Sequence, residues 1–355
     1  MKILCLIEAL GSGGAERQLS GLAALLKGDG NDVTVATYFP KDFYKPVLDE
    51  AVVEYLYLPK AQSHFNRLPV LAKTIKSFHP DVVIAYSPSA AEIACILKKL
   101  GFRFKLIVSE RNTTQVFNRN EKIKFFCYQW ADWVVPNSYS QAAFIKKHYP
   151  QYEPKVKVIT NFVDTDFFSP YEERTFGSQV CRMACVSRLA TQKNVLGFLD
   201  VVKRLKEEKV PIQIDWYGST NTDYGQQCIV KAHDLGLDDT ICFKGETNDI
   251  RSVYCQYDVM CLPSFYEGFP NVICEAMSCG TPILCGNVCD NGYIVSEGLN
   301  GLLFDPKNVD DMTKKIKDFV LMSEEQRKSI SEYNRQKALE LFSVDSFLRK
   351  YKELL

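Results

Sequence analysis

The sequence predicts an α/β protein of two domains, and three observations lead to this fold class. The chain has 355 residues, and single hydrophobic cores stop growing near about 250–300 residues. Short β-branched apolar runs alternate with helical patterns, as in parallel sheets that are covered on both faces. This alternation restarts after a polar stretch at 169–179. We therefore expect two Rossmann-like domains facing a central cleft.

The first half begins with a buried strand at 3–7 and an amphipathic helix at 15–26, whose Leu19, Leu22 and Leu26 share one face. We expect the first domain to span 1–168. The same criteria predict further strands at 32–37, 52–58, 82–86, 105–109, 133–136 and 156–159, and helices at 68–78 and 90–100.

The second half repeats this pattern, and we expect its domain to span 169–340. Residues 341–355 are expected to form a helix that packs back on the first domain. The predicted strands of this half are 181–186, 212–217, 241–244, 259–263 and 282–285, and its helices are 195–208, 226–235, 250–257, 270–279 and 310–322.

Composition excludes several classes of protein. The 43 basic and 43 acidic residues balance, whereas a nucleic-acid-binding protein usually has a basic excess. No stretch reaches the ~18 apolar residues that span a bilayer. The 13 cysteines and four histidines lack the spacing of a zinc site, which favours reduced, buried thiols. We expect a cytoplasmic protein with no metal and no nucleic-acid partner.

The positive charge is concentrated in one block. Residues 60–157 contain 16 Lys and Arg but 6 Asp and Glu. Within it, residues 98–147 interleave cations with aromatic side chains, a combination that suits the surface of an anionic membrane. The alternative is a solvated basic face with the aromatic side chains in the core. The sequence leaves both interpretations open.

The loop after the first strand is rich in glycine. Gly13 and Gly14 open the first predicted helix, whose N-terminal N–H groups suit an anion such as a diphosphate. The loop is not the dinucleotide fingerprint, because Glu16 stands where that motif needs glycine. A tight structural turn is the alternative.

Two further segments carry charge at predicted strand ends. Arg188 and Lys193 follow the strand at 181–186 on one loop, where two cations could clamp a diphosphate. After the strand at 259–263, Glu267 lies in a loop and Glu275 in the next helix, and both carboxylates can accept hydrogen bonds from paired hydroxyls.

Together these segments resemble the retaining glycosyltransferases of family 4 (group 1), which have the GT-B fold. The resemblance extends over nearly the whole chain and includes residues 161–164 and 300–304. It implies that the first domain binds the acceptor and the second the nucleotide-sugar donor. It also implies a ligand for each candidate residue. Gly13 and Gly14 would lie near the donor diphosphate and the acceptor, and Arg188 and Lys193 would neutralise the diphosphate. The donor sugar would be bound by Glu267 with Gly268, Phe269, Pro270 and Asn271, the ribose by Glu275, and the base by Gly245 and Asn248.

The sequence departs from the family pattern in two loops. Many relatives carry a histidine where this chain reads Ser109-Glu110-Arg111-Asn112, which resembles a subgroup that builds bacterial surface or lipid-linked glycans. We expect Glu110 and Arg111 to contact donor or acceptor, and a loop salt bridge is the alternative. The loop at 286–292 lacks the Gly-Gly-x-x-Glu pattern.

The resemblance implies a retaining, metal-independent hexosyl- or N-acetylhexosaminyltransferase without a cofactor. Its expected donor is a UDP-sugar, and its acceptor is a glycan or lipid-linked glycan at the inner face of the membrane. The triplet Asp164-Thr165-Asp166 spells a metal-binding DxD motif, but we expect the two loop cations to supply the countercharge. The alternatives are a nucleotide-sugar epimerase on the same scaffold and a non-catalytic nucleotide-sugar-binding subunit.

Overall fold

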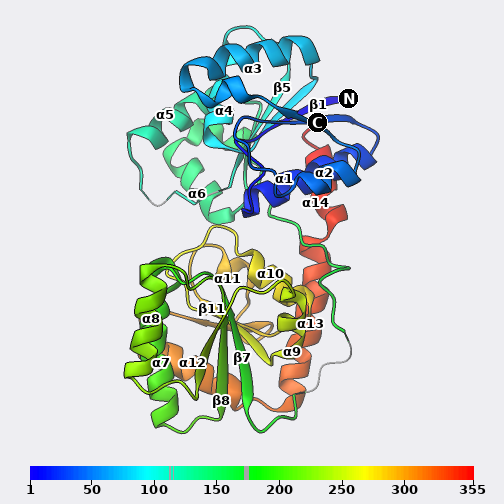
Figure 1. Cartoon of the computed structure of the whole chain (residues 1–355). Coiled ribbons are helices and arrows are strands. Elements are labelled where there is room, and N and C mark those ends of the chain that lie inside the picture. The colour runs from blue at the N-terminus through cyan, green and yellow to red at the C-terminus, as the bar shows by residue number, and fades with distance from the viewer. Residues whose placement is uncertain (112, 115, 172–175) are drawn as a thin grey trace. The chain divides into compact units, whose positions relative to one another are not determined.

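The computed structural model describes residues 1–111, 113–114, 116–171 and 176–355. The chain forms two compact units (Figure 1). The first unit contains Met1–Phe162 together with Asp345–Leu355, and the second contains Val163–Val344. The C-terminal residues Asp345–Leu355 thus belong to the first unit.

The first unit is built on a sheet of six parallel strands in the order β3-β2-β1-β4-β5-β6. The strands are β1 (Lys2–Leu6), β2 (Asp32–Thr37), β3 (Glu54–Tyr57), β4 (Val82–Ala85), β5 (Lys105–Glu110) and β6 (Trp133–Pro136). The α-helices are α1 (Gly14–Gly28), α2 (Lys45–Glu50), α3 (His64–Phe78), α4 (Pro88–Lys99), α5 (Arg119–Cys127), α6 (Tyr139–His148) and α14 (Val344–Lys352).

Helices cover both faces of this sheet. Apolar residues of α1, α2 and α14 pack on one face, and those of α3, α4, α5 and α6 pack on the other. Leu19, Leu22 and Leu26 of α1 are fully buried, as their spacing predicts. The C-terminal helix α14 contributes Phe347 and Tyr351 to the same core.

The second unit repeats the architecture with a parallel sheet in the order β12-β11-β10-β7-β8-β9. Its strands are β7 (Cys181–Val186), β8 (Ile212–Tyr217), β9 (Ile241–Gly245), β10 (Val259–Leu262), β11 (Ile283–Gly286) and β12 (Gly301–Phe304). Its α-helices are α7 (Val195–Glu207), α8 (Asp223–Asp234), α9 (Ile250–Gln256), α10 (Asn271–Ser278), α11 (Asn291–Ile294), α12 (Val309–Val320) and α13 (Glu324–Phe342). Short 3-10 helices among the described residues lie at Pro59–Gln62, Tyr128–Trp130 and Pro150–Lys155 in the first unit and at Thr191–Lys193 in the second.

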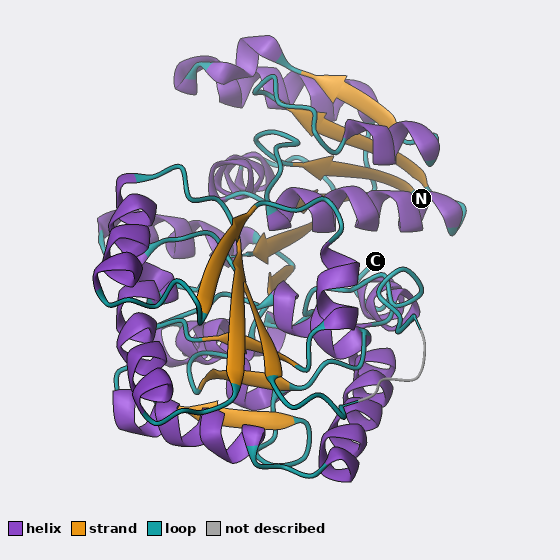
Figure 2. Ribbon diagram, turned by 60° about the horizontal axis from the view of Figure 1, so that its bottom comes forward, coloured by secondary structure: helices purple, strands orange, loops and turns teal. Residues whose placement is uncertain are grey.

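Helices again lie on both faces of the second sheet (Figure 2). Residues of α7, α8 and α12 form one core, and residues of α9, α10, α11 and α13 form the other. In both sheets the chain turns back at the centre, between β1 and β4 and between β7 and β10. Ligands of open parallel sheets bind beside such a reversal, at the carboxyl ends of the strands.

The fold class with two Rossmann-like domains is confirmed, and the differences lie in single elements. The strand predicted at 156–159 is wrong, because only an isolated bridge joins Val156 to Val134. Helix α5 was not predicted, since its apolar pattern is inverted: Lys124 is buried while Ile123 and Phe126 are exposed. The sequence interpretation also omitted α2, α6, α11, α13 and β12.

One glycine controls how closely two strand ends of the second unit approach. Gly218 follows β8 with φ of 155°, and a Cβ atom there would lie 2.0 Å from the carbonyl oxygen of Ser187. Gly218→Ala should therefore lower the free energy of unfolding by about 1–3 kcal/mol through strain and overpacking. Urea denaturation measures this. The control is Gly177→Ala, whose Cβ would meet nothing closer than 3.9 Å; equal stability of the two variants would contradict the close approach.

Candidate functional site

A buried ion pair joins two loops of the second unit. Lys193 follows β7 and Glu267 follows β10, and these strands are neighbours in the sheet. The Lys193 Nζ lies 2.6 Å from Glu267 Oε1, and the two side chains are only 13% and 9% exposed. The structure thus brings together two residues that the sequence places 74 positions apart.

Backbone contacts hold these two loops in register. The Phe265 N–H donates to the Gln192 carbonyl over 2.9 Å, and the Gln192 amide donates to the Tyr266 carbonyl over 2.8 Å. Asn194 adopts a left-handed conformation with φ of 53° and donates from Nδ2 to the Pro306 carbonyl over 2.7 Å. Because these contacts hold the residues on both sides of Lys193 and those just before Glu267, the two side chains have little freedom to separate.

Glu275 lies in α10 and is also buried. It accepts a hydrogen bond from the Tyr254 hydroxyl on α9 over 3.1 Å. The residues between Glu267 and this helix are those that were expected to present backbone to a sugar. Phe269 and Pro270 are buried, whereas Gly268 and Asn271 are partly exposed. Helix α10 begins at Asn271, with Pro270 as its N-cap residue.

Three other predicted donor residues lie at strand ends of the same unit. Arg188 follows β7 and is exposed, and its side chain makes no ion pair or hydrogen bond with other described residues. Gly245 ends β9 with φ of 75°, and its carbonyl accepts from the Gly218 N–H over 2.8 Å. Asn248 lies three positions further along the chain and is exposed.

The triplet that resembles a DxD motif forms a turn. The Asp164 carboxylate accepts from the N–H groups of Asp166 and Phe167 over 3.2 and 2.9 Å. Such side-chain-to-backbone bonds are typical of Asx turns. They give Asp164 a local role that accounts for its presence.

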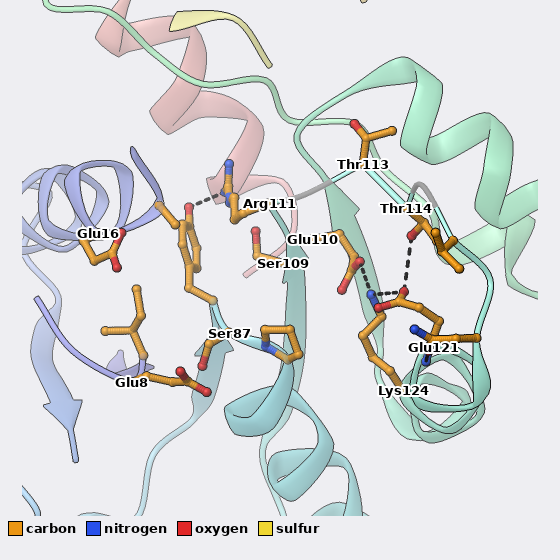
Figure 3. A pocket seen from close by; sticks show the side chains of 16 residues that line it. Glu8, Glu16, Ser87, Ser109, Glu110, Arg111, Thr113, Thr114, Glu121 and Lys124 are labelled. Carbon is orange, nitrogen blue, oxygen red and sulfur yellow. Dashed lines mark hydrogen bonds and ion pairs between the residues drawn. The ribbon is translucent and has the colours of Figure 1, made fainter. Parts of the chain in front are cut away.

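The first unit contains a pocket with a volume of about 420 Å³ (Figure 3). It lies at the carboxyl ends of β1, β4 and β5, beside the reversal of strand order. Glu8, Ser87, Glu110 and Arg111 line it from these strand ends. The predicted residues Glu110 and Arg111 therefore share one pocket, while Asn112 of the same loop lies outside the described residues.

Glu110 forms a buried ion pair, but its partner is on a helix and not in its own loop. It is 4% exposed, and its Oε2 lies 2.8 Å from Lys124 Nζ on α5. Lys124 also pairs with Glu121 over 2.7 Å, and the Tyr128 hydroxyl donates to Glu110. Burial alone lowers the pKa of Lys124, but the two carboxylates outweigh it and raise that pKa. Burial and the nearby Glu110 carboxylate raise the pKa of Tyr128.

Arg111 is held by the C-terminal helix. Its guanidinium donates to Asn161 over 2.9 Å, to the Tyr86 hydroxyl over 2.5 Å and to the Tyr351 hydroxyl over 2.8 Å. It also stacks on the Tyr86 ring, 4.1 Å from the ring centre. Helix α14 therefore fixes the side chain that was expected to contact a ligand.

The glycine-rich loop lies next to this pocket. Gly13 is the N-cap of α1, and Ala15 and Glu16 contribute to the pocket lining. A Cβ atom on Gly13 would lie 2.3 Å from Glu16 Oε2, so glycine leaves room for this side chain to fold back. Gly14 is the first residue of the helix.

Among the pocket residues that the sequence interpretation missed are Glu8, Ser87 and Lys124. Glu8 and Ser87 follow predicted strands, so their position at strand ends was a usable signal. Lys124 carried no such signal, because a lysine on a helix is usually exposed.

The buried pair gives a direct test of the pocket wall. Lys124→Met leaves Glu110 as a buried charge without its main partner, so we expect the free energy of unfolding to fall by about 3–5 kcal/mol. Thermal or urea denaturation measures this. Lys122→Met on the exposed side of α5 should change stability by no more than about 0.5 kcal/mol. Equal effects of the two variants would show that the Glu110 pair contributes nothing.

Two family models match this chain. Residues 12–167 match Glycosyltransferase Family 4, and residues 178–337 match Glycosyl transferases group 1. No helix in the described part of the chain is both long and apolar enough to span a bilayer.

Curated relatives match the chain over its whole length. An alpha-1,4-N-acetyl-D-galactosaminyltransferase of Campylobacter jejuni, named for the acceptor GalNAc-alpha-(1->4)-GalNAc-alpha-(1->3)-diNAcBac-PP-undecaprenol, is 25% identical over 100% of this chain and 98% of its own. The amylovoran biosynthesis glycosyltransferase AmsD of Erwinia amylovora is 24% identical over 100% and 99%.

Solved structures share the fold. HepE from Anabaena, in complex with UDP, matches with a TM-score of 0.86 at 21% identity, over 99% of each chain. A glycosyltransferase from Rickettsia africae matches with a TM-score of 0.87 at 21% identity, over 99% of this chain and 97% of its own.

Proposed function

Because this chain belongs to the group 1 and Family 4 glycosyltransferases, we propose that it transfers a sugar from a nucleotide diphosphate sugar to a hydroxyl of a lipid-linked glycan. The proposed donor is a UDP-sugar, and the transferred hexose or N-acetylhexosamine keeps its anomeric configuration. The names of two relatives support this choice: one acts on an undecaprenol-linked glycan, and a UDP-Gal-dependent galactosyltransferase of Escherichia coli is 29% identical over 56% of this chain.

The observation that carries the proposal is the Lys193–Glu267 ion pair at 2.6 Å. It puts a cation and a carboxylate side by side at the carboxyl ends of adjacent parallel strands, where ligands of such sheets bind. A diphosphate requires positive countercharge, and sugar hydroxyls donate well to a carboxylate. We therefore assign Lys193 to the donor diphosphate and Glu267 to hydroxyls of the donor sugar.

Further residues of the second unit complete the proposed donor site. Exposed Arg188 supplies a second positive charge from the same loop as Lys193, so this proposal assigns no countercharge to a metal ion. Glu275, oriented by Tyr254, accepts from the ribose hydroxyls. We assign the backbone of Gly268, Phe269, Pro270 and Asn271 to the sugar, and Gly245 and Asn248 to the base.

The proposed reaction needs little covalent chemistry from the protein. The acceptor oxygen bonds to the anomeric carbon on the same face from which the diphosphate leaves. The bond from that carbon to the phosphate oxygen breaks, and this oxygen takes the acceptor proton. Lys193 and Arg188 stabilise the charge that develops on the diphosphate, so positioning and electrostatics provide the acceleration.

We assign the acceptor to the pocket of the first unit. Glu110 and Arg111 stand in its wall, each immobilised by buried partners, and the loop with Gly13 and Gly14 lies next to it. Fixed polar groups around a concave site are typical of pockets that orient a small molecule. This pocket is therefore the part of the first unit best suited to a sugar.

One experiment separates this function from its two alternatives. The protein is incubated with isotopically labelled UDP-sugars and an undecaprenyl diphosphate-linked glycan, and products are followed by NMR. We expect a glycosylated acceptor whose new linkage has the anomeric configuration of the donor. An inverted linkage would contradict retention. A changed sugar on the nucleotide would indicate an epimerase, and an unaltered donor a binding subunit.

Replacing the lysine of the ion pair tests its assigned role. Lys193→Ala should lower kcat by about 10²–10³-fold, the usual loss when one group that stabilises developing charge is removed. Lys203→Ala on α7, where Lys203 pairs with exposed Glu207, should leave kcat unchanged. Thermal denaturation of both variants controls for folding. Wild-type turnover in a folded Lys193→Ala enzyme would remove this residue from the mechanism.

We also propose that this protein is cytoplasmic and that it contacts the inner face of the membrane through part of the basic and aromatic residues at 98–147. Ile123 and Phe126 are exposed on α5, and Phe126 packs edge-on against Trp130 at 5.6 Å. Lys99 lies 4.5 Å from the centre of the Trp130 ring, and Leu100 beside it is exposed. Apolar side chains among cations favour an anionic lipid surface.

Vesicle sedimentation tests this surface. Phe126→Ser should lower binding to phosphatidylglycerol vesicles by roughly threefold to tenfold, since one apolar side chain no longer inserts. Phe65→Ser is the matched control, because Phe65 is 94% exposed on α3. Equal binding of the two variants, or equal binding of the wild type to neutral phosphatidylcholine vesicles, would contradict the proposed contact.

A further inference from the structure

The pocket of the first unit contains a buried serine hydroxyl whose hydrogen-bonding capacity the described residues do not fill. Ser87 is 8% exposed, and within the described residues its Oγ has no hydrogen-bond partner. It is the N-cap residue of α4, yet its side chain accepts no bond from the helix. The nearby Tyr38 hydroxyl is shared with Ser89 and Glu8; burial raises the pKa of Tyr38, and a weaker interaction with the Ser87 side chain lowers it. Leaving such a group unpaired is unfavourable, and a hydrogen bond to a ligand hydroxyl would remove that cost.

Glu8 stands beside this hydroxyl. Strands β1 and β4 pair with Leu6 opposite Ala85, so Glu8 and Ser87 follow at matching positions of neighbouring strands (Figure 3). The Ser89 hydroxyl donates to Glu8 Oε1 over 2.5 Å and orients the carboxylate. A carboxylate and a hydroxyl in the wall of one pocket suit the hydroxyls of a sugar ring.

The pocket as a whole is acidic. Its lining contains four carboxylates but two cations, Arg111 and Lys124. Lys124 is paired with two of the carboxylates, Glu110 and Glu121. The negative charges of Glu8 and Glu16 therefore dominate the rest of the lining. These charges would repel the carboxylate of a ligand, because the pocket is partly shielded from water.

We infer that this pocket selects an uncharged, hydroxyl-rich sugar as the terminal residue of the acceptor, and that Glu8 and Ser87 determine this specificity. The inference deepens the proposed function and rests on it. Glu8 and Ser87 bond to sugar hydroxyls, and the negative balance rejects acidic sugars such as uronic acids. A site built around buried polar groups discriminates strongly against a ligand that leaves them unpaired.

Arg111 is the cation of the lining whose partners are neutral, so it favours an acidic sugar. Its terminal nitrogens already donate to Asn161, Tyr86 and Tyr351, and its plane stacks on the Tyr86 ring. These neutral partners fix the guanidinium in place and occupy the nitrogens that pair best with a carboxylate. Preference for an acidic sugar would mean that Arg111 outweighs the carboxylates.

Two aryl glycosides that differ at one carbon test the inference. The affinities of p-nitrophenyl α-glucoside and p-nitrophenyl α-glucuronide are measured by ligand-observed NMR, alongside transfer from a UDP-sugar. We expect the glucoside to bind at least about tenfold more tightly, the ratio expected from repulsion of about 1.4 kcal/mol. Glu8→Gln should bring the ratio closer to one, and Ser87→Ala should weaken binding of the glucoside. Glu50→Gln, an exposed carboxylate on α2, should change neither affinity.

The outcomes separate the two proposals. Equal affinities, tighter binding of the glucuronide, no binding of the glucoside at millimolar concentration, or unchanged ratios in a folded Glu8→Gln protein would each overturn the inference. Selective glucoside binding without transfer from any UDP-sugar would instead contradict the proposed function and leave the selectivity standing. Ser87→Ala keeps the inference testable should Glu8→Gln fail to fold.

Discussion

The ion pair between Lys193 and Glu267 is the interaction on which the second unit's candidate site depends. Its members come from loops that follow neighbouring strands, and both side chains are largely buried. Removal of either partner would leave a buried charge uncompensated, which is far more costly than breaking an exposed pair. The pair therefore fixes the two loops relative to each other and keeps a positive and a negative group at one strand edge.

The same constraint operates in the first unit with different residues. Glu110 ends β5 and is neutralised by Lys124, which α5 brings in from the side. Both buried pairs lie at carboxyl ends of strands near the reversal of strand order. In this fold ligands bind at these strand ends, so a buried charge there needs a partner that fixes its position and compensates its charge. In each unit one lysine performs that function.

Much of the fold could be predicted because buried parallel strands are almost entirely apolar. Strands β2, β6, β7 and β8 have the predicted bounds, and each contains buried apolar residues without competing helical periodicity. Helix α5 shows where prediction from the apolar pattern fails. Its buried Lys124 and exposed Phe126 reverse the usual pattern, and only the position of Glu110 in three dimensions explains why a lysine is buried there.

The candidate site was predictable as a set of residues but not as a set of contacts. Loop positions after strands identified Arg188, Lys193 and Glu267 individually, because strand ends are where charged groups are useful. Their pairing is a long-range property: the Lys193–Glu267 contact depends on β7 and β10 being neighbours, which no local pattern encodes. The same reason explains why Ser87 and Glu8 escaped notice, since their significance comes from the register of β1 and β4.

The central claim is that Lys193 recognises the diphosphate and Glu267 recognises the sugar. Isothermal titration of UDP and of a UDP-sugar into Lys193→Met and Glu267→Gln proteins tests it most directly. The account predicts that Lys193→Met lowers the affinity for both ligands about tenfold or more, and that Glu267→Gln lowers the affinity for the UDP-sugar alone. Equal losses of UDP affinity in the two variants, or no loss in either, would contradict it.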